Sequence, residues 1–537
     1  MKNLLLKIDK YLDKHTTLWI FIILLVVLRV PNFFEPYWYG DEGIYLTIGQ
    51  SIRHGQKLYT DIVDHKTPVI YYLATVPTQF HFRVLLMAWM ITTTVIFYIL
   101  SKTFFKKNYL VWLNLIIFVT LTTLPWLEGN IPNGELFVLG FVMVGWWLAI
   151  KSGFLQKLFA TSSNEPKSIN KSPRLLFLSG VFYGLAILTK VPALTDLASI
   201  LLIPWFILTE KILQLDKKNI KLIMEHAKSS LQKSRTLILG VILTILLSIV
   251  YFVSQGAGSD YLKFGLLYNF HYTQSWKLDL NNPLLNLLFT LPIKTLLLFA
   301  IIGLLSYLKV FSLKFKFFLC WSCFALYASL LSNRPYPHYL IQIILPLSFL
   351  TTVTVEKVAN WFKNKKNNKE TLAVFLSGAG VWVMTIAVLL LLNFRVYSTK
   401  NYYQNFFKFI RGDYNQQEYY QTFNHLMTDN YKIAEFLKNV QAKELFIWGT
   451  NPMLYALSNT VPQTRFTVSF HITDLKLYKE TLNEVVVNQP KFIVVMNNAP
   501  AFPEFYAYLD DHYLANYEYE HMILYKRLNA QDKLLAQ

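Results

Sequence analysis

From residue 17 to about residue 394, long apolar runs alternate with short polar segments. Each run is close to the roughly 20 residues that an α-helix needs to cross the hydrocarbon core of a bilayer. The sequence therefore predicts an α-helical polytopic membrane protein with about eleven transmembrane helices. The expected spans are 17–31, 83–101, 108–126, 135–151, 174–189, 192–208, 236–254, 286–307, 315–332, 338–355 and 372–394.

Lysine and arginine concentrate in every second connection between these runs, as they do in cytoplasmic loops. With the N-terminus inside, the cytoplasmic segments are 102–107, 157–174, 211–235, 309–316 and 357–369. The opposite face receives 33–82, 127–134, 254–283, the turn SNRPYPH and everything after about residue 394. We therefore expect any chemistry on the extracytoplasmic face.

Composition agrees with a multi-pass protein of the cell membrane. The chain has 537 residues, of which 54% are hydrophobic and 15% charged. Its net charge of +19 lies in the loops between apolar runs, so we assign it to topology and expect no nucleic-acid partner. Cys320 and Cys323 lie in one apolar run, where packing is expected rather than metal binding or redox chemistry. No small-residue cleavage site follows the first run, which is expected to remain as an anchor.

Beyond residue 394, mixed polar and apolar sequence replaces the long runs. The helical segments are 432–440 and 477–486, and the β-rich segments are 444–449, 491–496 and 521–527. Their order predicts a small layered sheet covered by helices. We expect a transmembrane domain over 1–394 and an extracytoplasmic α/β domain over 395–537.

The loop between the first two runs is rich in carboxylates and aromatic residues. Asp41 and Glu42 open it, and Tyr45 follows one helical turn later. Asp41 is a candidate general base, although an aspartate at the start of a helical pattern can equally be an N-cap. Glu42 can orient Asp41 or a substrate, but an acid at a helix start is stabilised by the helix dipole in any case. Residues 68–80 are apolar but short for a span, and they predict a helix lying in the membrane interface.

Lys66 stands near the end of the same loop. A lysine beside a membrane often reaches the lipid head groups, but its charge can also neutralise a phosphate. His65 is interpreted as a structural histidine, because no second and third metal ligand are spaced nearby. In the outer loop 254–283, His271 and Tyr272 are weaker candidates for substrate contact.

Two other outer segments contain polar residues at the start of apolar runs. Asn133 can cap the helix that follows it, whereas Glu135, at the start of a lipid-embedded helix, is expected to face a cavity or a partner. Arg334 can bind a phosphate through two hydrogen bonds, and His338 can donate to the same phosphate from one turn away. The alternative for Arg334 and Tyr339 is anchorage at the membrane interface.

These segments together resemble the GT-C glycosyltransferases, in the branch of protein O-mannosyltransferases and lipid A aminoarabinose transferases. The first loop matches the patterns D-E-x-x-Y, G-x-x-x-Y-x-D and D-x-K-x-P, and the outer segments match N-x-E and R-x-x-x-H-Y. Thr67 departs from the family, which more often has a Lys-Pro-Pro run. Gly180, Gly184 and Lys190 are also similar to a family signature, although small residues there mainly permit close helix packing.

The resemblance implies roles for these residues. Catalysis is expected from Asp41 as the base, with Glu42 beside it. The donor phosphate is expected to contact Lys66, Arg334 and His338. Substrate contacts are expected from Tyr45, Tyr59, Asp64, Asn133, Glu135 and Tyr339. No residue is assigned as a metal ligand.

The leading hypothesis is an inverting membrane glycosyltransferase of the cell envelope. It would move a monosaccharide from a polyprenyl-phosphate donor to a hydroxyl of a protein, lipid or glycan acceptor, as in protein glycosylation. No cofactor is required, since no nucleotide-binding fingerprint is present, while the use of a divalent metal is left open. The rival hypothesis is a multi-spanning transporter or lipid flippase, which composition alone favours but which predicts ionisable residues near the bilayer midplane. A third is a catalytically silent sugar-binding protein.

Overall fold

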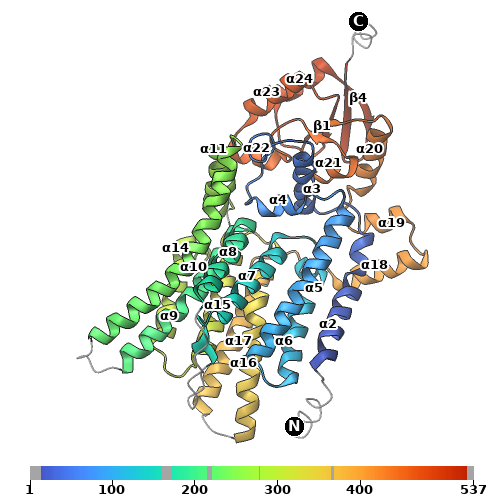
Figure 1. Cartoon of the computed structure of the whole chain (residues 1–537). Helices are drawn as coiled ribbons and strands as arrows, with labels where there is room; N and C mark the ends of the chain where they lie inside the picture. The colour runs from blue at the N-terminus through green and yellow to red at the C-terminus, as the bar shows by residue number, and fades with distance from the viewer. Residues whose placement is uncertain (1–13, 160–171, 215–219, 277, 365–367, 529–537) are drawn as a thin grey trace. The chain divides into compact units, whose positions relative to one another are not determined.

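The computed structural model describes residues 14–159, 172–214, 220–276, 278–364 and 368–528 (Figure 1). Parts of three predicted cytoplasmic segments, at 160–171, 215–219 and 365–367, lie outside the described residues. The chain forms two compact units. The first comprises Met1–Arg29, Leu86–Ser248 and Phe270–Ser398, and the second comprises Val30–Leu85, Ile249–Asn269 and Thr399–Gln537.

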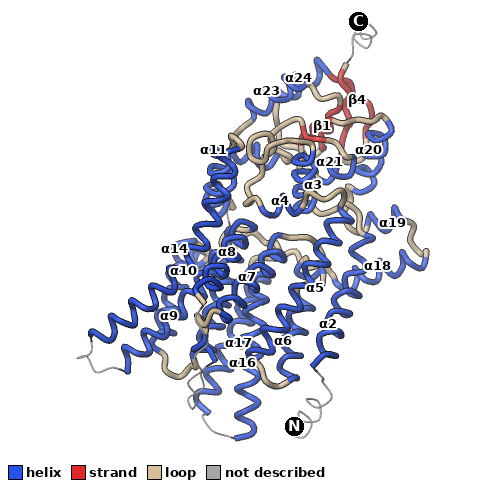
Figure 2. Tube along the Cα trace, in the orientation of Figure 1, coloured by secondary structure: helices blue, strands red, loops and turns tan. Residues whose placement is uncertain are grey.

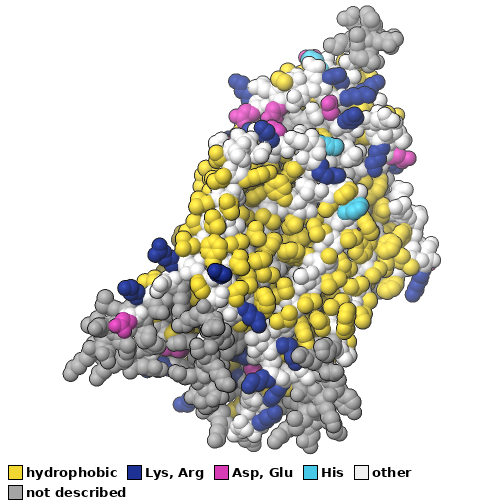
Figure 3. All heavy atoms as spheres, viewed as in Figure 1, with side chains coloured by type: hydrophobic (Ala, Val, Ile, Leu, Met, Phe, Trp, Pro, Cys, Tyr) yellow, Lys and Arg dark blue, Asp and Glu magenta, His cyan; other side chains and the backbone are white. Residues whose placement is uncertain are grey.

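The first unit is built from helices and their connections (Figure 2). Its helices are α2 (Lys14–Arg29), α5 (Gln79–Phe104, whose first residues belong to the second unit), α6 (Asn108–Leu121), α7 (Gly134–Lys151), α8 (Pro173–Thr189), α9 (Leu194–Gln214), α10 (Ile220–Ser254, whose last residues belong to the second unit), α12 (Tyr268–Gln274, whose first two residues belong to the second unit), α13 (Pro283–Leu288), α14 (Leu291–Tyr307), α15 (Leu313–Ser329), α16 (Ile341–Asn364) and α17 (Asn368–Leu391). Helix α16 packs against α6, α7, α15 and α17, and α7 packs against α8. Hydrophobic side chains gather on the visible surface of these helices (Figure 3).

Membrane-spanning character is clear in seven helical segments among the described residues, by length and composition. They are Thr16–Phe34, Gln79–Phe104, Gly134–Lys151, Val191–Glu210, Ser234–Ser254, Pro337–Asn364 and Asn368–Leu391. Three further apolar helices, α6, α8 and α14, are shorter. The remaining expected span, 315–332, corresponds to α15, a 17-residue helix that carries Lys314 and Lys316. A polytopic helical protein is thus confirmed, and the count of about eleven spans stays a prediction.

Two expected helices are shorter than the apolar pattern indicated. The run 286–307 is divided into α13 and α14, because Pro292 at the start of α14 lacks a backbone N–H and begins a new helix. The interfacial helix expected over 68–80 is wrong in extent, since α4 covers only Val69–Leu73. Pro77 disfavours helical backbone at the residue before it, so the chain turns before α5 begins.

The second unit combines the first loop with the C-terminal region. The loop supplies the 3-10 helix η1 (Val30–Phe34), α3 (Gly40–Arg53) and α4, and residues 249–269 add α11 (Gly258–Asp260) and the π-helical turn η5 (Tyr261–Leu267). The C-terminal helices are α18 (Thr399–Arg411), α19 (Gln416–Gln421), α20 (Met427–Asn439), α21 (Met453–Ser458), α22 (Ser469–Leu475), α23 (Tyr478–Asn488) and α24 (Pro503–His512). Helix α3 packs against α21, where the Cα of Gly43 allows the backbone of Met453 to approach closely.

A five-stranded mixed sheet forms the centre of the C-terminal region (Figure 2). Its strands are β1 (Glu444–Trp448), β2 (Val461–Pro462), β3 (Phe492–Met496), β4 (Tyr513–Glu518) and β5 (Met522–Arg527), in the order β2-β1-β3-β5-β4. Strands β2, β1 and β3 are parallel, whereas β5 and β4 are antiparallel, with Val494 opposite Leu524. All of β3 is buried, so it forms the core. The predicted strands β1, β3 and β5 are confirmed.

Candidate functional site

Asp41 lies in the first turn of α3, one residue inside the helix. The N-cap position belongs to Tyr39, whose side chain makes no capping hydrogen bond, so the alternative interpretation of Asp41 as an N-cap is wrong. The Asp41 carboxylate instead accepts a hydrogen bond from the Tyr45 hydroxyl at 3.2 Å. Its side chain is about a quarter exposed, at 26%. A carboxylate in this position remains accessible to a substrate, as a general base must be.

Lys66 lies between two carboxylates. Its ammonium group is 3.5 Å from Asp41 Oδ1 and 3.6 Å from Asp64 Oδ2, and it stands 5.1 Å from the centre of the Tyr45 ring. The lysine side chain is only 10% exposed. A buried ammonium group needs such compensation, because an unpaired charge is costly to remove from water. Lys66 is therefore held inside the protein surface by Asp41 and Asp64, unlike a lysine that extends into lipid head groups.

The backbone around Lys66 is fixed by two buried tyrosines. Tyr59 has a φ of 72°, an unusual conformation for a bulky residue. Its hydroxyl donates to the Lys66 carbonyl at 2.8 Å, and the Lys66 N–H donates to the Tyr71 hydroxyl at 3.1 Å. Tyr59 is fully buried. Its geometry therefore supports a role in positioning Lys66, and not the direct substrate contact that was expected from the sequence.

Glu42 has a structural environment. It is buried, and its two carboxylate oxygens accept hydrogen bonds from Arg83 at 2.9 and 2.8 Å and from Gln79 at 2.9 Å. Arg83 also lies 3.4 Å from Glu35. This paired, hydrogen-bonded arrangement satisfies the buried charges. Glu42 therefore ties α3 to the start of α5, and its geometry does not support the catalytic role expected from the sequence.

Asp64 lies on the other side of Lys66 and is fully buried. Its Oδ2 accepts a hydrogen bond from the Tyr71 hydroxyl at 2.5 Å, while its Oδ1 is 3.0 Å from His65 Nδ1 and 3.1 Å from His471 Nε2. Burial by itself would raise the pKa of the Asp64 carboxyl, but Lys66 and the two imidazoles hold that pKa well below its usual range. Asp64 is thus a charged centre that organises the cluster, with no surface for direct substrate contact.

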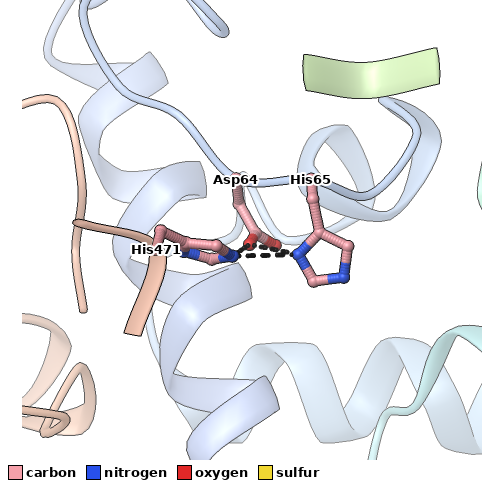
Figure 4. Close-up of side chains that lie close together, drawn as sticks. All are labelled: Asp64, His65 and His471. Atoms are coloured by element: carbon pink, nitrogen blue, oxygen red, sulfur yellow. Dashed lines mark hydrogen bonds and ion pairs between the residues drawn. The ribbon is translucent and has the colours of Figure 1, made fainter. Parts of the chain in front are cut away.

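Asp64, His65 and His471 form a compact triangle of potential metal ligands (Figure 4). His65 Nδ1 and His471 Nε2 are 3.0 Å apart, and they lie 3.0 and 3.1 Å from Asp64 Oδ1, so the three atoms are nearly equidistant. Two imidazole nitrogens and one carboxylate oxygen are ligands that Zn²⁺ takes in proteins, so these three side chains would hold such a cation. Burial lowers the pKa of His65 to about 4, against the opposing effect of Asp64, so its imidazole is neutral and able to ligate. The residues therefore fit a metal ion.

The pairing of His471 with His65 was not predicted from the sequence. The two residues are 406 positions apart, and His471 comes from α22 in the C-terminal region. Neither residue belongs to a short metal-binding motif, so spacing carried no signal for the pair. The isolated bridge between Val63 and Phe466 shows how the first loop is joined to this distant segment.

In the first unit, Glu135 pairs with Lys190, which the sequence placed in a family-like segment without a role of its own. Glu135 is buried at the start of α7, and its Oε1 contacts the Lys190 ammonium group. Lys190 also stands 4.5 Å from the centre of the Tyr339 ring, whose hydroxyl is 3.2 Å from that of Tyr272. Glu135 thus faces a cationic partner, as expected of a carboxylate in a lipid-embedded helix.

His338 pairs with Glu128, which the sequence analysis also missed. Both side chains are buried, and His338 Nδ1 contacts Glu128 Oε2. Glu128 has a left-handed backbone with φ 58°. Arg29 fixes this turn by donating to the carbonyls of Thr122 and Gly129 at 2.9 and 2.7 Å. Asn133 occupies the N-cap position of α7 without a capping bond, and its amide donates to the Glu128 carbonyl at 3.4 Å.

Arg334 is held between aromatic rings. Its guanidinium group lies 4.2 Å from the centre of the Tyr272 ring and 5.2 Å from that of Trp276, and it donates to Ser275 Oγ at 2.8 Å. Only 5% of the residue is exposed. Stacking on aromatic faces orients a guanidinium plane while leaving its edge able to donate hydrogen bonds.

The predicted residues therefore fall into two groups. Asp41, Tyr45, Tyr59, Asp64 and Lys66 are brought together in the second unit. Glu135, Tyr339, His338, Asn133 and Arg334 lie in the first unit, in the pairs and stacks just described. A site shared by Lys66 and Arg334 stays a prediction.

Comparisons with known proteins establish which fold the chain resembles. No family model matches the chain, and no curated protein matches it in sequence. Among solved structures, the chain is similar to ArnT from Cupriavidus metallidurans bound to undecaprenyl phosphate, with a TM-score of 0.53 and 12% identity over 96% of this chain and 99% of that one. It also matches the archaeal oligosaccharyltransferase AglB from Archaeoglobus fulgidus, with a TM-score of 0.41 and 12% identity over 90% and 69% of the two chains. The protein therefore has a fold similar to that of ArnT, a GT-C membrane glycosyltransferase, over nearly its whole length.

Proposed function

We propose that the protein is a membrane glycosyltransferase that uses a polyprenyl-phosphate-linked sugar. The observation that carries this proposal is the pairing of Asp41 with Lys66 at the start of α3. A partly exposed carboxylate and a buried ammonium group 3.5 Å apart offer a base for an acceptor hydroxyl and a positive charge for a departing phosphate. The likeness in fold to a structure bound to undecaprenyl phosphate supports a donor of that chemical class.

The proposed reaction is a single displacement at the anomeric carbon. Asp41 accepts the proton of the acceptor hydroxyl as the hydroxyl oxygen attacks that carbon. The bond between the anomeric carbon and the phosphate oxygen breaks, and its electron pair leaves with the polyprenyl phosphate. Configuration at the anomeric carbon is inverted, because attack and departure occur on opposite faces.

Lys66 acts mainly on the leaving group in this proposal. As negative charge grows on the phosphate, the ammonium group can shift its interaction from Asp41 toward the phosphate oxygens, which stabilises the transition state. The same shift would free Asp41 to accept a proton. Asp64, held by Tyr71, keeps Lys66 in place throughout.

Arg334 and His338 are proposed as further phosphate ligands. Arg334 is oriented by Tyr272 and Trp276, and the contact with Glu128 orients the His338 imidazole. Glu135, Lys190 and Tyr339 are proposed to contact the sugar, since a carboxylate and an ammonium group offer both kinds of hydrogen-bond partner to hydroxyl groups.

The experiment is a transfer assay with purified protein in detergent or vesicles. A panel of polyprenyl-phosphate monosaccharides is supplied together with acceptor peptides, glycans and lipids, and the release of free polyprenyl phosphate is measured. Donor consumption that depends on acceptor and is lost in Asp41→Asn supports the proposal. Movement of intact lipid-linked sugar across vesicles, without cleavage of its phosphate bond, would favour the transporter or flippase alternative.

A further inference from the structure

Helix α18, Thr399–Arg411, has one side packed into the second unit. The Tyr402 hydroxyl donates to Glu35 Oε1 at 2.5 Å and lies 3.0 Å from Asn32 Oδ1. One turn later, the ring of Phe406 lies 5.4 Å from that of Phe34. This side fixes the orientation of the helix.

The next side of α18 is apolar and exposed. With 3.6 residues per turn, Phe407 and Ile410 point about a quarter turn away from the packed side, and each is 55% exposed. Phe34, which packs on α18 through Phe406, is itself 41% exposed. An exposed apolar surface of this kind costs free energy in water and indicates a partner.

The remaining side is basic. Lys400, Lys408 and Arg411 are exposed and follow the apolar residues around the helix, and α18 contains no acidic residue. Lys408 is steadied by a hydrogen bond to the Tyr414 hydroxyl at 3.2 Å. An apolar strip bordered by lysine and arginine is the pattern of helices that lie in the interface of an anionic membrane.

The partner that covers this face follows from where α18 lies in its own unit. Phe34, its packing neighbour, is the last residue of the candidate span Thr16–Phe34. The exposed strip therefore begins beside the residue at which this candidate span ends. A bilayer surface satisfies both the apolar strip and the basic border.

We propose that α18 anchors the second unit to the membrane surface. Phe407 and Ile410 enter the boundary between head groups and acyl chains, while Lys400, Lys408 and Arg411 bind the phosphates of anionic phospholipids. This anchoring is independent of the transfer reaction, so it stands or falls separately from the proposed function.

The test measures the lipid contact of a single position in the full-length protein. Phe407→Cys, with Cys320→Ala and Cys323→Ala, is labelled with an environment-sensitive fluorophore and reconstituted in vesicles that contain a lipid-borne quencher. The matched control is Val487→Cys on α23, an apolar residue that is 78% exposed in the same unit. Vesicles of phosphatidylcholine alone are compared with vesicles that include phosphatidylglycerol.

We expect quenching at position 407 to exceed that at position 487 several-fold, and to increase when phosphatidylglycerol is present. The triple change Lys400→Glu, Lys408→Glu and Arg411→Glu should abolish that increase while the melting temperature stays close to the parent's. Equal quenching at the two positions would overturn the proposed membrane anchor. A label at position 407 that is shielded from water but not quenched by lipid would also overturn it, because that result indicates a protein partner. Equal quenching in the two kinds of vesicle would overturn the binding of anionic head groups.

Discussion

At the scale of single residues, the central arrangement is a cation shared by two carboxylates in different surroundings. Asp64 is buried and bound by Tyr71 and two histidines, whereas Asp41 is partly exposed and bound by Tyr45. Two carboxylates with such different environments suit different tasks. We assign a structural task to Asp64 and the chemical one to Asp41.

Asp41→Asn separates basicity from shape. Asparagine has nearly the same size and can still accept a hydrogen bond from Tyr45, so the fold and donor binding should persist. Turnover should fall on the order of a hundredfold or more, the usual effect of losing a general base. Transfer rates and thermal unfolding of parent and variant decide the matter. Unchanged turnover in a stably folded variant would exclude Asp41 as the base.

Lys66→Ala should weaken use of the donor by roughly 1.5 to 3 kcal/mol, the range for a charge-assisted hydrogen bond. Arg334→Ala is expected to act in the same direction and by a similar amount. Part of the Lys66 effect should arise because Asp41 and Asp64 lose their shared counter-ion. Donor binding and transfer are measured against Lys57→Ala, which removes an exposed lysine from the same loop. An effect in Lys57→Ala as large as in Lys66→Ala would point to general electrostatic attraction in place of a specific contact.

The triangle of Asp64, His65 and His471 predicts a metal content. Purified protein should contain about one equivalent of a transition metal, Zn²⁺ above all, given two nitrogen ligands and one oxygen ligand. His471→Ala should lose most of this metal. His521→Ala should keep the metal, because His521 lies outside the triangle: among the described residues, the acid within 3.5 Å of its imidazole is Asp429. Elemental analysis of the three proteins measures this directly. A metal-free parent protein, purified without chelators, would leave the triangle as a hydrogen-bonded cluster.

At the scale of elements, the long helices were predictable because length and apolar character are local properties of the chain. Strand β4 was missed for the opposite reason. Four of its six residues are exposed, as befits an edge strand, so it lacks an apolar pattern. The buried strands β1 and β3 were readily recognised. The helix predicted over 68–80 was too long, because turn residues after α4 end the helix although the sequence stays apolar.

Helices α8 and α10 approach each other closely at two glycines, and this approach can be tested by substitution. A Cβ added to Gly180 would lie 2.0 Å from the Leu237 carbonyl oxygen, and one added to Gly240 would lie 2.1 Å from that of Phe177. Gly180→Ala should therefore destabilise the protein by about 1–3 kcal/mol, as overpacking does. Gly303→Ala on α14, where the added Cβ meets nothing within 4 Å, is the control. Thermal unfolding in one detergent compares them, and equal stability of the two variants would contradict the close approach.

At the scale of the whole molecule, the segments were predictable from the sequence, but their grouping in space was not. The first loop, residues 249–269 and the C-terminal region form one unit. Arg465, for example, donates to the Tyr59 carbonyl at 3.0 Å and lies 3.3 Å from Asp260. Such pairings between distant segments leave no periodicity or spacing in the sequence. For the same reason Asp41, Lys66 and Asp64, which are near one another in the chain, could be predicted as a site, whereas His471 and the Glu128–His338 pair could not.

The grouping of these segments makes the predicted topology testable as a whole. If the basic loops are cytoplasmic, then the first loop and the C-terminal region must share the extracytoplasmic face, because they fold together as one unit. A reporter fused after Tyr402 should therefore be active only in its extracytoplasmic form, and one fused after Lys309 only in its cytoplasmic form. Labelling of a cysteine at exposed Val487 in intact cells by a membrane-impermeant reagent should give the same answer without truncating the chain. Cytoplasmic activity of the Tyr402 fusion, together with protection of position 487, would reverse the orientation and remove the external site on which the proposed reaction depends.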